Sequence, residues 1–356
     1  MPSRPTLSSP PQPRFVVLRP ELAMMRASVF ALALALSGCV SFHAGAMPGE
    51  PANATFMTIN GVRMRYVDQG AGSPVVLIHG FASSIENWTA VMPALVADGH
   101  RVIAMDLHGF GWTDRAPGDY SSESQARLVL ALMDRLNIDR ADIVGHSYGG
   151  GVTLQIALLE PARVQRIALY DAWVYDDQLP AFFHIARADG IGEAMFATWY
   201  GERTEDRMAL AFYDQRFVTM ELIDAVEASL RRPGTYAAAL AAVRGMHYER
   251  IQTRYGEVTQ PTLLLWGRED HVTTLDVGER LVRTLPGARL VVYPGCGHFP
   301  MIEHAAQSTA ELVRFLHDDN AQTTRASEHE TSGGEVSISG VSVEPSSPES
   351  DWETPQ

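Results

Sequence analysis

Short hydrophobic runs alternate with stretches of helical periodicity between about residues 55 and 316. Runs at 56–59 and 62–67 flank Asn60-Gly61, a dipeptide that favours a two-residue hairpin turn, so this pair is predicted to be antiparallel. The later runs are almost wholly apolar, as is typical of parallel strands buried on both faces. They lie at residues 74–79, 101–106, 141–145, 164–170, 262–266 and 289–293. The pattern predicts an α/β fold with a mostly parallel, eight-stranded sheet and flanking helices.

Residues 172–260 interrupt this alternation and read as helices rich in alanine, leucine, methionine and charged side chains. Helices are predicted at 193–199, 205–214 and 221–230, with breaks at Pro180 and at Pro233-Gly234. The chain is therefore divided into a first core part (55–171), a helical insertion (172–260) and a second core part (261–317).

The N-terminal 38 residues are predicted to be an extension and signal peptide. A charged start at residues 24–26 precedes an apolar run at 27–36, which is shorter than the roughly 20 residues needed to cross a bilayer. The run closes as Leu-Ser-Gly-Cys, which resembles the bacterial lipobox, so Cys39 is the expected lipidation site and membrane anchor. A lipid-anchored cell-envelope protein is expected, with a periplasmic or secreted protein as the alternative. Residues 39–54 are predicted to be a linker.

Residues 318–356 hold nine acidic side chains against the single Arg325, with few hydrophobic residues. Such a composition cannot bury enough apolar surface to fold, so a disordered acidic tail is predicted. It is either a solvated end or a spacer that binds a partner.

The amino-acid composition excludes several classes of enzyme and binding protein. All 28 basic residues are arginine, so Schiff-base enzymes, covalently held pyridoxal phosphate and lysine-containing phosphate loops are excluded. A net charge of -14 argues against nucleic-acid binding. Cys39 and Cys296 are the two cysteines, which rules out a disulfide framework.

The strongest motif is Gly-X-Ser-X-Gly at residues 145–149, between a buried strand and an apolar helix. Small residues are needed there because the strand turns sharply into the helix and lifts the serine hydroxyl clear of the sheet. Ser147 is the predicted nucleophile. A glycine-rich phosphate-binding turn is the alternative, but no Gly-X-Gly-X-X-Gly follows an early strand.

A serine nucleophile needs a base and an acid that orients it. His298 and Asp270 each follow a predicted strand, and the order Ser147, Asp270, His298 fits this constellation. Asp171 is the rival acid, and Glu269 is expected to be a solvated neighbour. The backbone amides of Phe81 and Tyr148 are the predicted oxyanion donors, because residues 79–81 follow an early buried strand.

Together these motifs resemble the α/β-hydrolase superfamily, in particular its compact bacterial branch. The resemblance covers about residues 62–315 and rests on the ordered segments at 79–81, 106–111, 145–149, 266–270 and 297–298. It implies that the helical insertion is a cap after the sixth strand, that Asp106 is part of a structural turn, and that His79 supports its loop. Serine at 147 separates the chain from the epoxide hydrolases and haloalkane dehalogenases, which carry aspartate there.

The expected activity is a cofactor-free carboxylesterase that cleaves small to medium apolar esters through an acyl-enzyme. A carbon–carbon bond hydrolase, a perhydrolase or a peptidase on the same fold are the alternatives, and an inactive envelope scaffold is a remote one. Arg231 and Arg232 either hold a substrate carboxylate or form a solvated helix end. The histidines lack paired metal-binding spacing, so no metal site is expected. Six large side chains of the insertion either line an acyl pocket between cap and core or only fill the hydrophobic interior: Trp173, Phe182, Phe183, Met195, Phe196 and Trp199.

Overall fold

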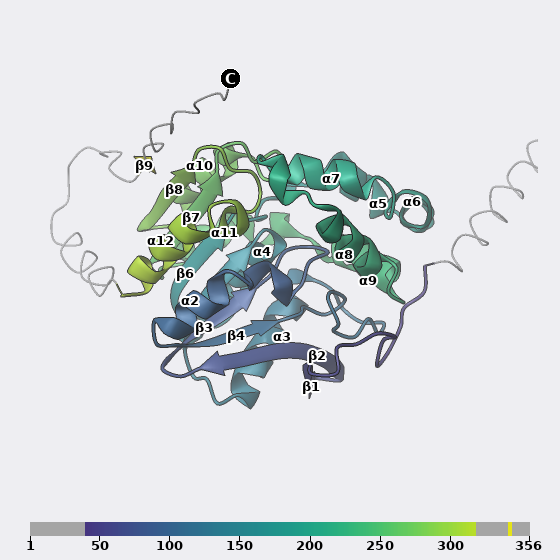
Figure 1. Ribbon diagram of the computed structural model, residues 1–356, viewed down its shortest axis with the longest axis horizontal. Helices are drawn as coiled ribbons and strands as arrows, with labels where there is room; N and C mark the ends of the chain where they lie inside the picture. Colours follow the sequence, from purple (N-terminus) through teal and green to yellow (C-terminus); the bar gives the residue numbers. More distant parts are fainter. Residues whose placement is uncertain (1–39, 318–340, 344–356) are drawn as a thin grey trace, which may run out of the picture.

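A computed structural model describes residues 40–317 and 341–343 (Figure 1). Its centre is one twisted sheet with the strand order β1-β2-β4-β3-β5-β6-β7-β8-β9. The strands are β1 (Thr55–Ile59), β2 (Val62–Gly70), β3 (Ser73–Ile78), β4 (His100–Met105), β5 (Ala141–His146), β6 (Val164–Tyr170), β7 (Thr262–Gly267), β8 (Ala288–Tyr293) and β9 (Val341–Val343). The predicted eight-stranded, mostly parallel sheet is confirmed as β1 to β8.

The antiparallel part of the sheet is confined to its first strands. Asn60 and Gly61 both have positive φ, 49° and 85°, as a tight hairpin turn requires, and Ile59 pairs with Val62 across it. β2 continues past the predicted end at Val67 because its polar last residues pair with β4, for example Gln69 with Val102. All later pairings, from β4 with β3 to β8 with β9, are parallel.

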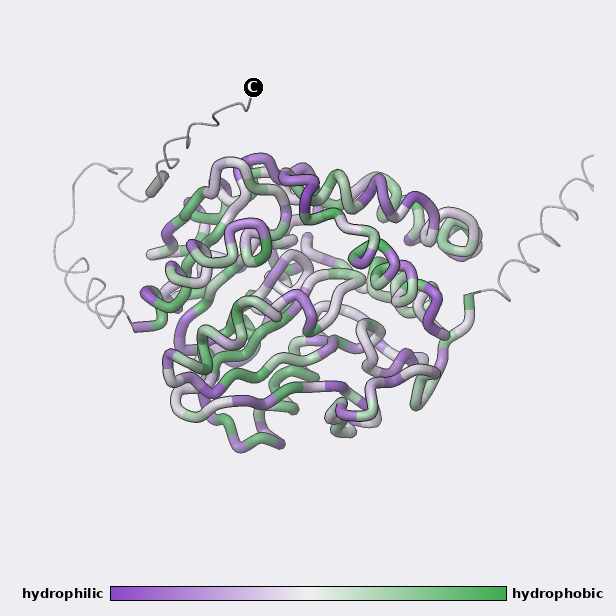
Figure 2. The backbone as a smooth tube through the Cα atoms, in the orientation of Figure 1, coloured by the Kyte–Doolittle hydropathy of each residue, from purple (hydrophilic) through white to green (hydrophobic). Residues whose placement is uncertain are grey.

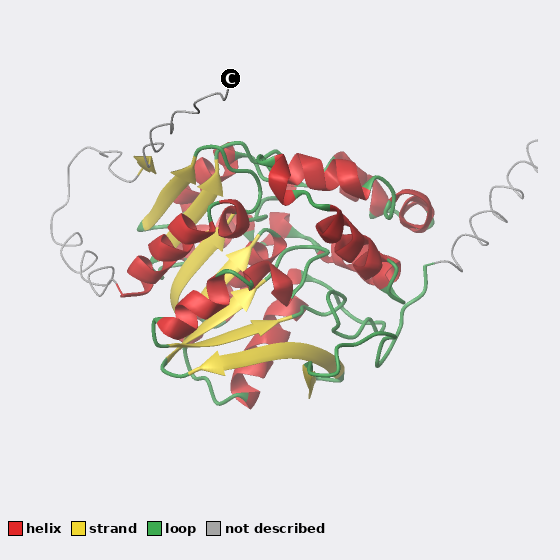
Figure 3. Ribbon diagram, viewed as in Figure 1, coloured by secondary structure: helices red, strands yellow, loops and turns green. Residues whose placement is uncertain are grey.

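Helices cover both faces of the sheet and bury two apolar layers (Figures 2 and 3). One face packs against α2 (Val91–Ala97), α11 (Pro300–Glu303) and α12 (Ala305–His317); the other packs against α3 (Ser122–Arg135), α4 (Tyr148–Leu159) and α10 (Leu275–Thr284). The central strands β3 and β5 are therefore buried from both sides, which explains their uninterrupted hydrophobic sequences.

The insertion forms a cap of helices beside the sheet (Figure 3). It comprises α5 (Ala181–Ala186), α6 (Ile191–Trp199), α7 (Thr204–Ala211), α8 (Met220–Leu230) and α9 (Thr235–Gly245). The helix predicted at 205–214 ends earlier, at Ala211, and the sequence pattern did not delimit α5 or α9. Short 3-10 turns complete the described elements: η1 (Ile85–Trp88), η2 (Pro161–Arg163), η3 (Asp176–Gln178), η4 (Gln215–Phe217), η5 (Tyr248–Arg250) and η6 (Gln252–Glu257).

The segment that precedes β1 is fastened to the core, in contrast to the predicted linker at 39–54. His43 and Arg115 exchange two backbone hydrogen bonds of 3.0 and 3.1 Å, and Met47 is buried. Glu50 accepts two hydrogen bonds from the guanidinium of Arg63, at 2.7 and 2.8 Å. These contacts tie the chain to the core from residue 43 onward.

Both chain ends lie largely outside the described residues. The predicted signal peptide and Cys39 are among the residues that are not described, and so is the acidic tail apart from β9, which pairs in parallel with β8. Within the described ranges, no helix has the length and hydrophobicity to cross a bilayer.

Gly149 generates a prediction about stability. A Cβ atom at this position would lie 2.3 Å from the carbonyl oxygen of Ile78 and 2.6 Å from that of His79, and neither backbone group can move freely. We expect Gly149→Ala to lower the free energy of unfolding by about 2 kcal/mol in urea titrations. Gly256→Ala is the control, because its Cβ would meet nothing closer than 4.0 Å. Equal effects of the two substitutions would contradict the packing argument.

Candidate active site

Ser147 lies at a strained turn between β5 and α4. Its φ of 51° and ψ of -120° are outside the regions that residues with side chains normally adopt. Three backbone hydrogen bonds hold it there: its N–H donates to Tyr170 (2.9 Å), and its carbonyl accepts from Gly150 (2.9 Å) and Trp173 (2.8 Å). The strand, turn and helix expected around residues 145–149 are therefore all present, and they hold the serine at the helix N-terminus.

Two free amides border this serine. A Cβ at Gly80 would lie 3.1 Å from the Ser147 Cβ, so the loop after β3 runs directly beside the turn. Among the described residues, the backbone N–H groups of Phe81 and Tyr148 have no hydrogen-bond acceptor. Amides left unpaired in a buried environment are costly unless a ligand uses them. Their position fits the predicted oxyanion hole.

Asp270 and His298 form a buried hydrogen-bonded pair. The Asp270 Oδ2 and the His298 Nδ1 are 2.7 Å apart. Asp270 also accepts hydrogen bonds from the amides of Val272 (2.7 Å) and Thr273 (3.0 Å) and from the Thr273 hydroxyl (2.7 Å). Burial alone would raise the pKa of Asp270, but the charge of His298 and these hydrogen bonds lower it. Asp270 thus holds the imidazole by Nδ1 and leaves Nε2 available to accept a proton.

Asp171, the rival acid, has a different environment. Its Oδ1 accepts a hydrogen bond from the Gly267 amide (2.9 Å), whereas its buried Oδ2 has no partner. Burial, and then the charge of Asp270, raise its pKa well above the usual range. Burial thus favours the neutral form of Asp171, and the structure gives the histidine contact to Asp270 alone.

The loop of His298 is held in place by neighbours that the motifs do not reveal. Its backbone N–H donates to the Ala211 carbonyl at the end of α7 (2.7 Å), and its carbonyl accepts from the His146 Nε2 (2.9 Å). The His146 Nδ1 is 3.2 Å from the Asn87 amide nitrogen, so both ring nitrogens are occupied. Burial lowers the pKa of His146 well below its usual value, which keeps the ring neutral. His146 occupies a free position of the motif, so no sequence signal identified it.

Glu269 is not the solvated neighbour expected from the sequence. Its Oε2 accepts the amides of Gly295 (2.7 Å) and Cys296 (3.1 Å), and thereby ties the loop that carries the acid to the loop that carries the base. The Cys296 thiol is buried and burial raises its pKa, so it is a small structural residue. Gly267 also belongs to this junction, because a Cβ there would lie 1.9 Å from the Gly297 carbonyl oxygen.

Asp106 and His79 organise the turn after β4. The Asp106 carboxylate accepts the amides of Ile85 and Trp112, each at 2.8 Å, and contacts the Arg65 guanidinium at 3.3 Å. The Leu107 amide donates to the His79 Nε2 at 2.9 Å, and burial lowers the pKa of His79. Both residues have the structural roles that the resemblance implied.

The surroundings of the candidate site are aromatic. The Phe81 ring contacts five others, with centroid separations of 5.3 to 6.4 Å: Phe110, Tyr148, Trp173, Phe183 and Tyr200. Of the predicted pocket residues, Trp173 and Phe183 therefore reach the site. Phe182 and Phe196 pack on each other inside the cap, with Met195 buried nearby on α6. Trp199 is 62% exposed, so its side chain lies largely at the surface, which corrects its assignment.

The predicted arginine pair does not reach the catalytic groups. Arg231 is largely exposed and pairs with Glu227 one turn earlier, as a solvated helix end does. Arg232 stacks 3.5 Å from the Trp112 ring centroid and donates to the Gly111 carbonyl (3.0 Å), so it ties the cap to the turn after β4. Both side chains thus contact other groups of the protein, Arg231 at the surface and Arg232 at the cap–core junction.

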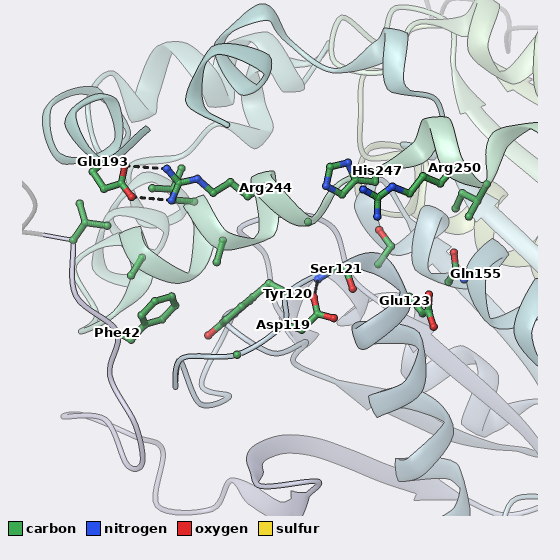
Figure 4. A pocket seen from close by; sticks show the side chains of 18 residues that line it. Phe42, Asp119, Tyr120, Ser121, Glu123, Gln155, Glu193, Arg244, His247 and Arg250 are labelled. Atoms are coloured by element: carbon green, nitrogen blue, oxygen red, sulfur yellow. Dashed lines mark hydrogen bonds and ion pairs between the residues drawn. The ribbon is translucent and has the colours of Figure 1, made fainter. Parts of the chain in front are cut away.

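A separate cavity of about 580 Å³ lies between α9 and the loop that precedes α3 (Figure 4). It contains none of the predicted catalytic residues. Arg244 and Glu193 form an ion pair along one wall (2.7 Å), and Phe42 stacks on Tyr120 at the other, with ring centroids 5.9 Å apart. Charged groups of both signs line it, and no side chain there is arranged as a nucleophile and base.

Metal-ligating side chains do not gather at the candidate site. Within the described ranges, one group of three such residues occurs elsewhere, at Asp98, His100 and His317. Local spacing along the sequence did not indicate this group, because His317 is more than two hundred residues away from the other two along the chain.

Comparison with known proteins places the chain in a family. Residues 73–305 match the model of the alpha/beta hydrolase fold family, and the chain belongs to this family. It is similar to the 2-hydroxy-6-oxononadienedioate/2-hydroxy-6-oxononatrienedioate hydrolase of Paraburkholderia xenovorans, with 34% identity over 72% of this chain and 91% of that protein. Its fold resembles a meta-cleavage product hydrolase from Pseudomonas fluorescens (TM-score 0.66, 30% identity, 75% of this chain and 98% of the other). A thermophilic esterase from Thermogutta terrifontis is also similar (TM-score 0.65, 26% identity, 74% and 98%).

The contrasting environments of the two aspartates generate a second prediction. Asp270→Asn should reduce kcat on the order of 10³-fold or more, because the amide cannot stabilise a protonated His298. Asp171→Asn should retain kcat within about threefold, since the amide resembles the protonated carboxyl that it replaces. Steady-state kinetics on one ester substrate compares them. A larger loss in Asp171→Asn would reverse the assignment of the acid.

Stability against pH provides a second readout for Asp171. A carboxyl whose pKa is raised by folding stabilises the fold below its unfolded pKa of about 3.9, and this stability is lost as pH rises through the folded pKa. Between about pH 5 and pH 8, wild type should therefore lose more unfolding free energy than Asp171→Asn. Parallel pH profiles would show that the carboxyl is already ionised in the folded protein.

Proposed function

We propose that this chain is a serine hydrolase in which Ser147, His298 and Asp270 form the catalytic triad. The observation that carries the proposal is the buried 2.7 Å contact between Asp270 and the His298 Nδ1, in a chain whose elbow serine adjoins two free amides. The Ser147 hydroxyl attacks a substrate carbonyl carbon and transfers its proton to the His298 Nε2. The Phe81 and Tyr148 amides stabilise the oxyanion, and the imidazolium then protonates the leaving group. Water releases the acyl group from serine by the same sequence of steps.

We propose that the enzyme cleaves a carbon–carbon bond next to the carbonyl group of its substrate. Support comes from relatives such as the 2-hydroxymuconate semialdehyde hydrolase of Pseudomonas sp., which is 31% identical over 93% of its length. An ester and a diketone both present a carbonyl carbon to the serine and differ in the leaving atom, which is oxygen in one and carbon in the other. In the diketone the His298 imidazolium therefore has to protonate a carbon atom. This step needs a carbanionic leaving group that is stabilised by conjugation.

A specific observation favours ester hydrolysis, the activity first expected from the sequence, as the second candidate. Two cap arginines that could bind a substrate carboxylate already donate hydrogen bonds within the protein. Arg232 donates to the Gly111 carbonyl, and Arg207 donates to the carbonyls of Tyr200 and Glu202. The rings around Phe81 form an apolar wall that suits an uncharged acyl group.

Two measurements test the mechanism and the bond separately. Wild type should react with a fluorophosphonate probe, whereas Ser147→Ala should show no labelling, because the probe reports the activated hydroxyl itself. Unchanged labelling would refute the triad. The value of kcat/KM should be higher for a vinylogous diketone acid than for short p-nitrophenyl esters, and a preference of more than about tenfold for the esters would establish the second candidate instead.

We also propose that the protein is exported and anchored through a lipid on Cys39. The support is the charged start, the short apolar run and the Leu-Ser-Gly-Cys ending of residues 24–39. Mass spectrometry of the protein from bacterial membranes should find an acylated N-terminal Cys39 peptide, and Cys39→Ala should move the protein out of the membrane fraction. An unmodified N-terminus at another residue would refute the anchor and leave a periplasmic or secreted protein.

A further inference from the structure

Three side chains from distant parts of the chain meet at the end of the sheet where β4 begins. Asp98 follows α2, His100 is the first residue of β4, and His317 is in the last turn of α12. Their ligand atoms all lie within 4.8 Å of one another. The cluster contains none of the residues assigned to the triad, the oxyanion hole or the cap.

Both imidazoles converge on one carboxylate oxygen. The Asp98 Oδ2 is 2.7 Å from the His317 Nε2 and 3.1 Å from the His100 Nε2. The first contact is an ordinary hydrogen bond. The second is longer but still within hydrogen-bond distance; its angles are not those of a hydrogen bond, so the His100 Nε2 has no hydrogen-bond partner among the described residues.

The unpartnered nitrogen of His100 is a costly arrangement for the protein alone. The His100 side chain is only 7% exposed, and its other nitrogen, Nδ1, lies 3.4 Å from the Ser73 carbonyl oxygen. A carbonyl only accepts, so Nδ1 carries the proton in the neutral ring and Nε2 keeps a lone pair. Two lone pairs, on the buried His100 and on the partly exposed Asp98, then face each other at 3.1 Å.

A transition-metal ion relieves this arrangement. Zinc bonds to imidazole nitrogen and carboxylate oxygen at about 2.0 to 2.2 Å, which places tetrahedral ligands about 3.3 Å apart. The observed separations of 2.7 and 3.1 Å reach that spacing with shifts of about half an ångström. The Ser73 carbonyl already provides the outer partner that ligating histidines usually have.

We propose that Asp98, His100 and His317 form a binding site for a divalent transition-metal ion of the zinc type. Two imidazoles and one carboxylate supply three ligands, and because the His317 side chain is 59% exposed, water can complete the coordination. The metal joins the end of α12 to the start of β4. It acts as a clamp on the fold, remote from the hydrolytic chemistry.

The test is titration of the full-length, untagged and chelator-treated protein with ZnCl2 by isothermal calorimetry. Wild type should bind one Zn²⁺, and Zn²⁺ should raise its melting temperature. His317→Ala should weaken binding by at least about tenfold and abolish the rise in melting temperature. His317 is exposed, so this variant is expected to fold, and its fluorophosphonate labelling should equal that of wild type.

Two controls make the assignment specific. Asp98→Asn should weaken binding as His317→Ala does, whereas His184→Ala, which removes an exposed histidine of the cap, should bind Zn²⁺ like wild type. The proposal is overturned if wild type binds no Zn²⁺ or if His317→Ala binds as tightly as wild type. It is also overturned if only His298→Ala loses affinity, which would place the ion at the triad.

Discussion

The candidate site depends on the hydrogen bond between Asp270 and His298, and that bond depends on the exclusion of water. Burial on its own would raise the pKa of Asp270 and neutralise it. The carboxylate stays charged because Thr273 and the neighbouring amides surround it with donors while the imidazole provides the opposite charge. Burial and the charge of Asp270 raise the pKa of the neighbouring Asp171, which disfavours a second negative charge in the same buried space. The loops that follow β7 and β8 are joined by hydrogen bonds from Gly295 and Cys296 to Glu269, and they hold this pair in place.

Strain and packing locate the serine with respect to that pair. The positive φ of Ser147 is maintained by backbone hydrogen bonds from β6 and from the segment after it, not by its own side chain. Gly80 and Gly267 permit the contacts between loops that bring the amides, the serine and the histidine together, since a Cβ at either position would meet a neighbouring atom. The geometry thus depends on the close approach of backbone segments.

Hydrophobic pattern and motif spacing were enough to predict the sheet, and they singled out Asp270 and His298, which the structure brings into contact. Asn60-Gly61 specified its turn, and the strand-to-helix change around Ser147 specified the elbow, because both depend on local conformation. Residues that act through distant partners could not be predicted. His146 binds a carbonyl 152 positions away, and Glu269 binds amides 26 and 27 positions away, so no local pattern distinguishes them from solvated residues. The same limit explains why residues 43–50 were expected to be a linker.

The hydrogen bond from the His298 amide to the Ala211 carbonyl joins the base to the cap. A displacement of α7 that broke this bond would release the backbone that positions the imidazole. The orientation of the His298 ring is therefore coupled mechanically to the position of the cap, although the two lie in different parts of the chain.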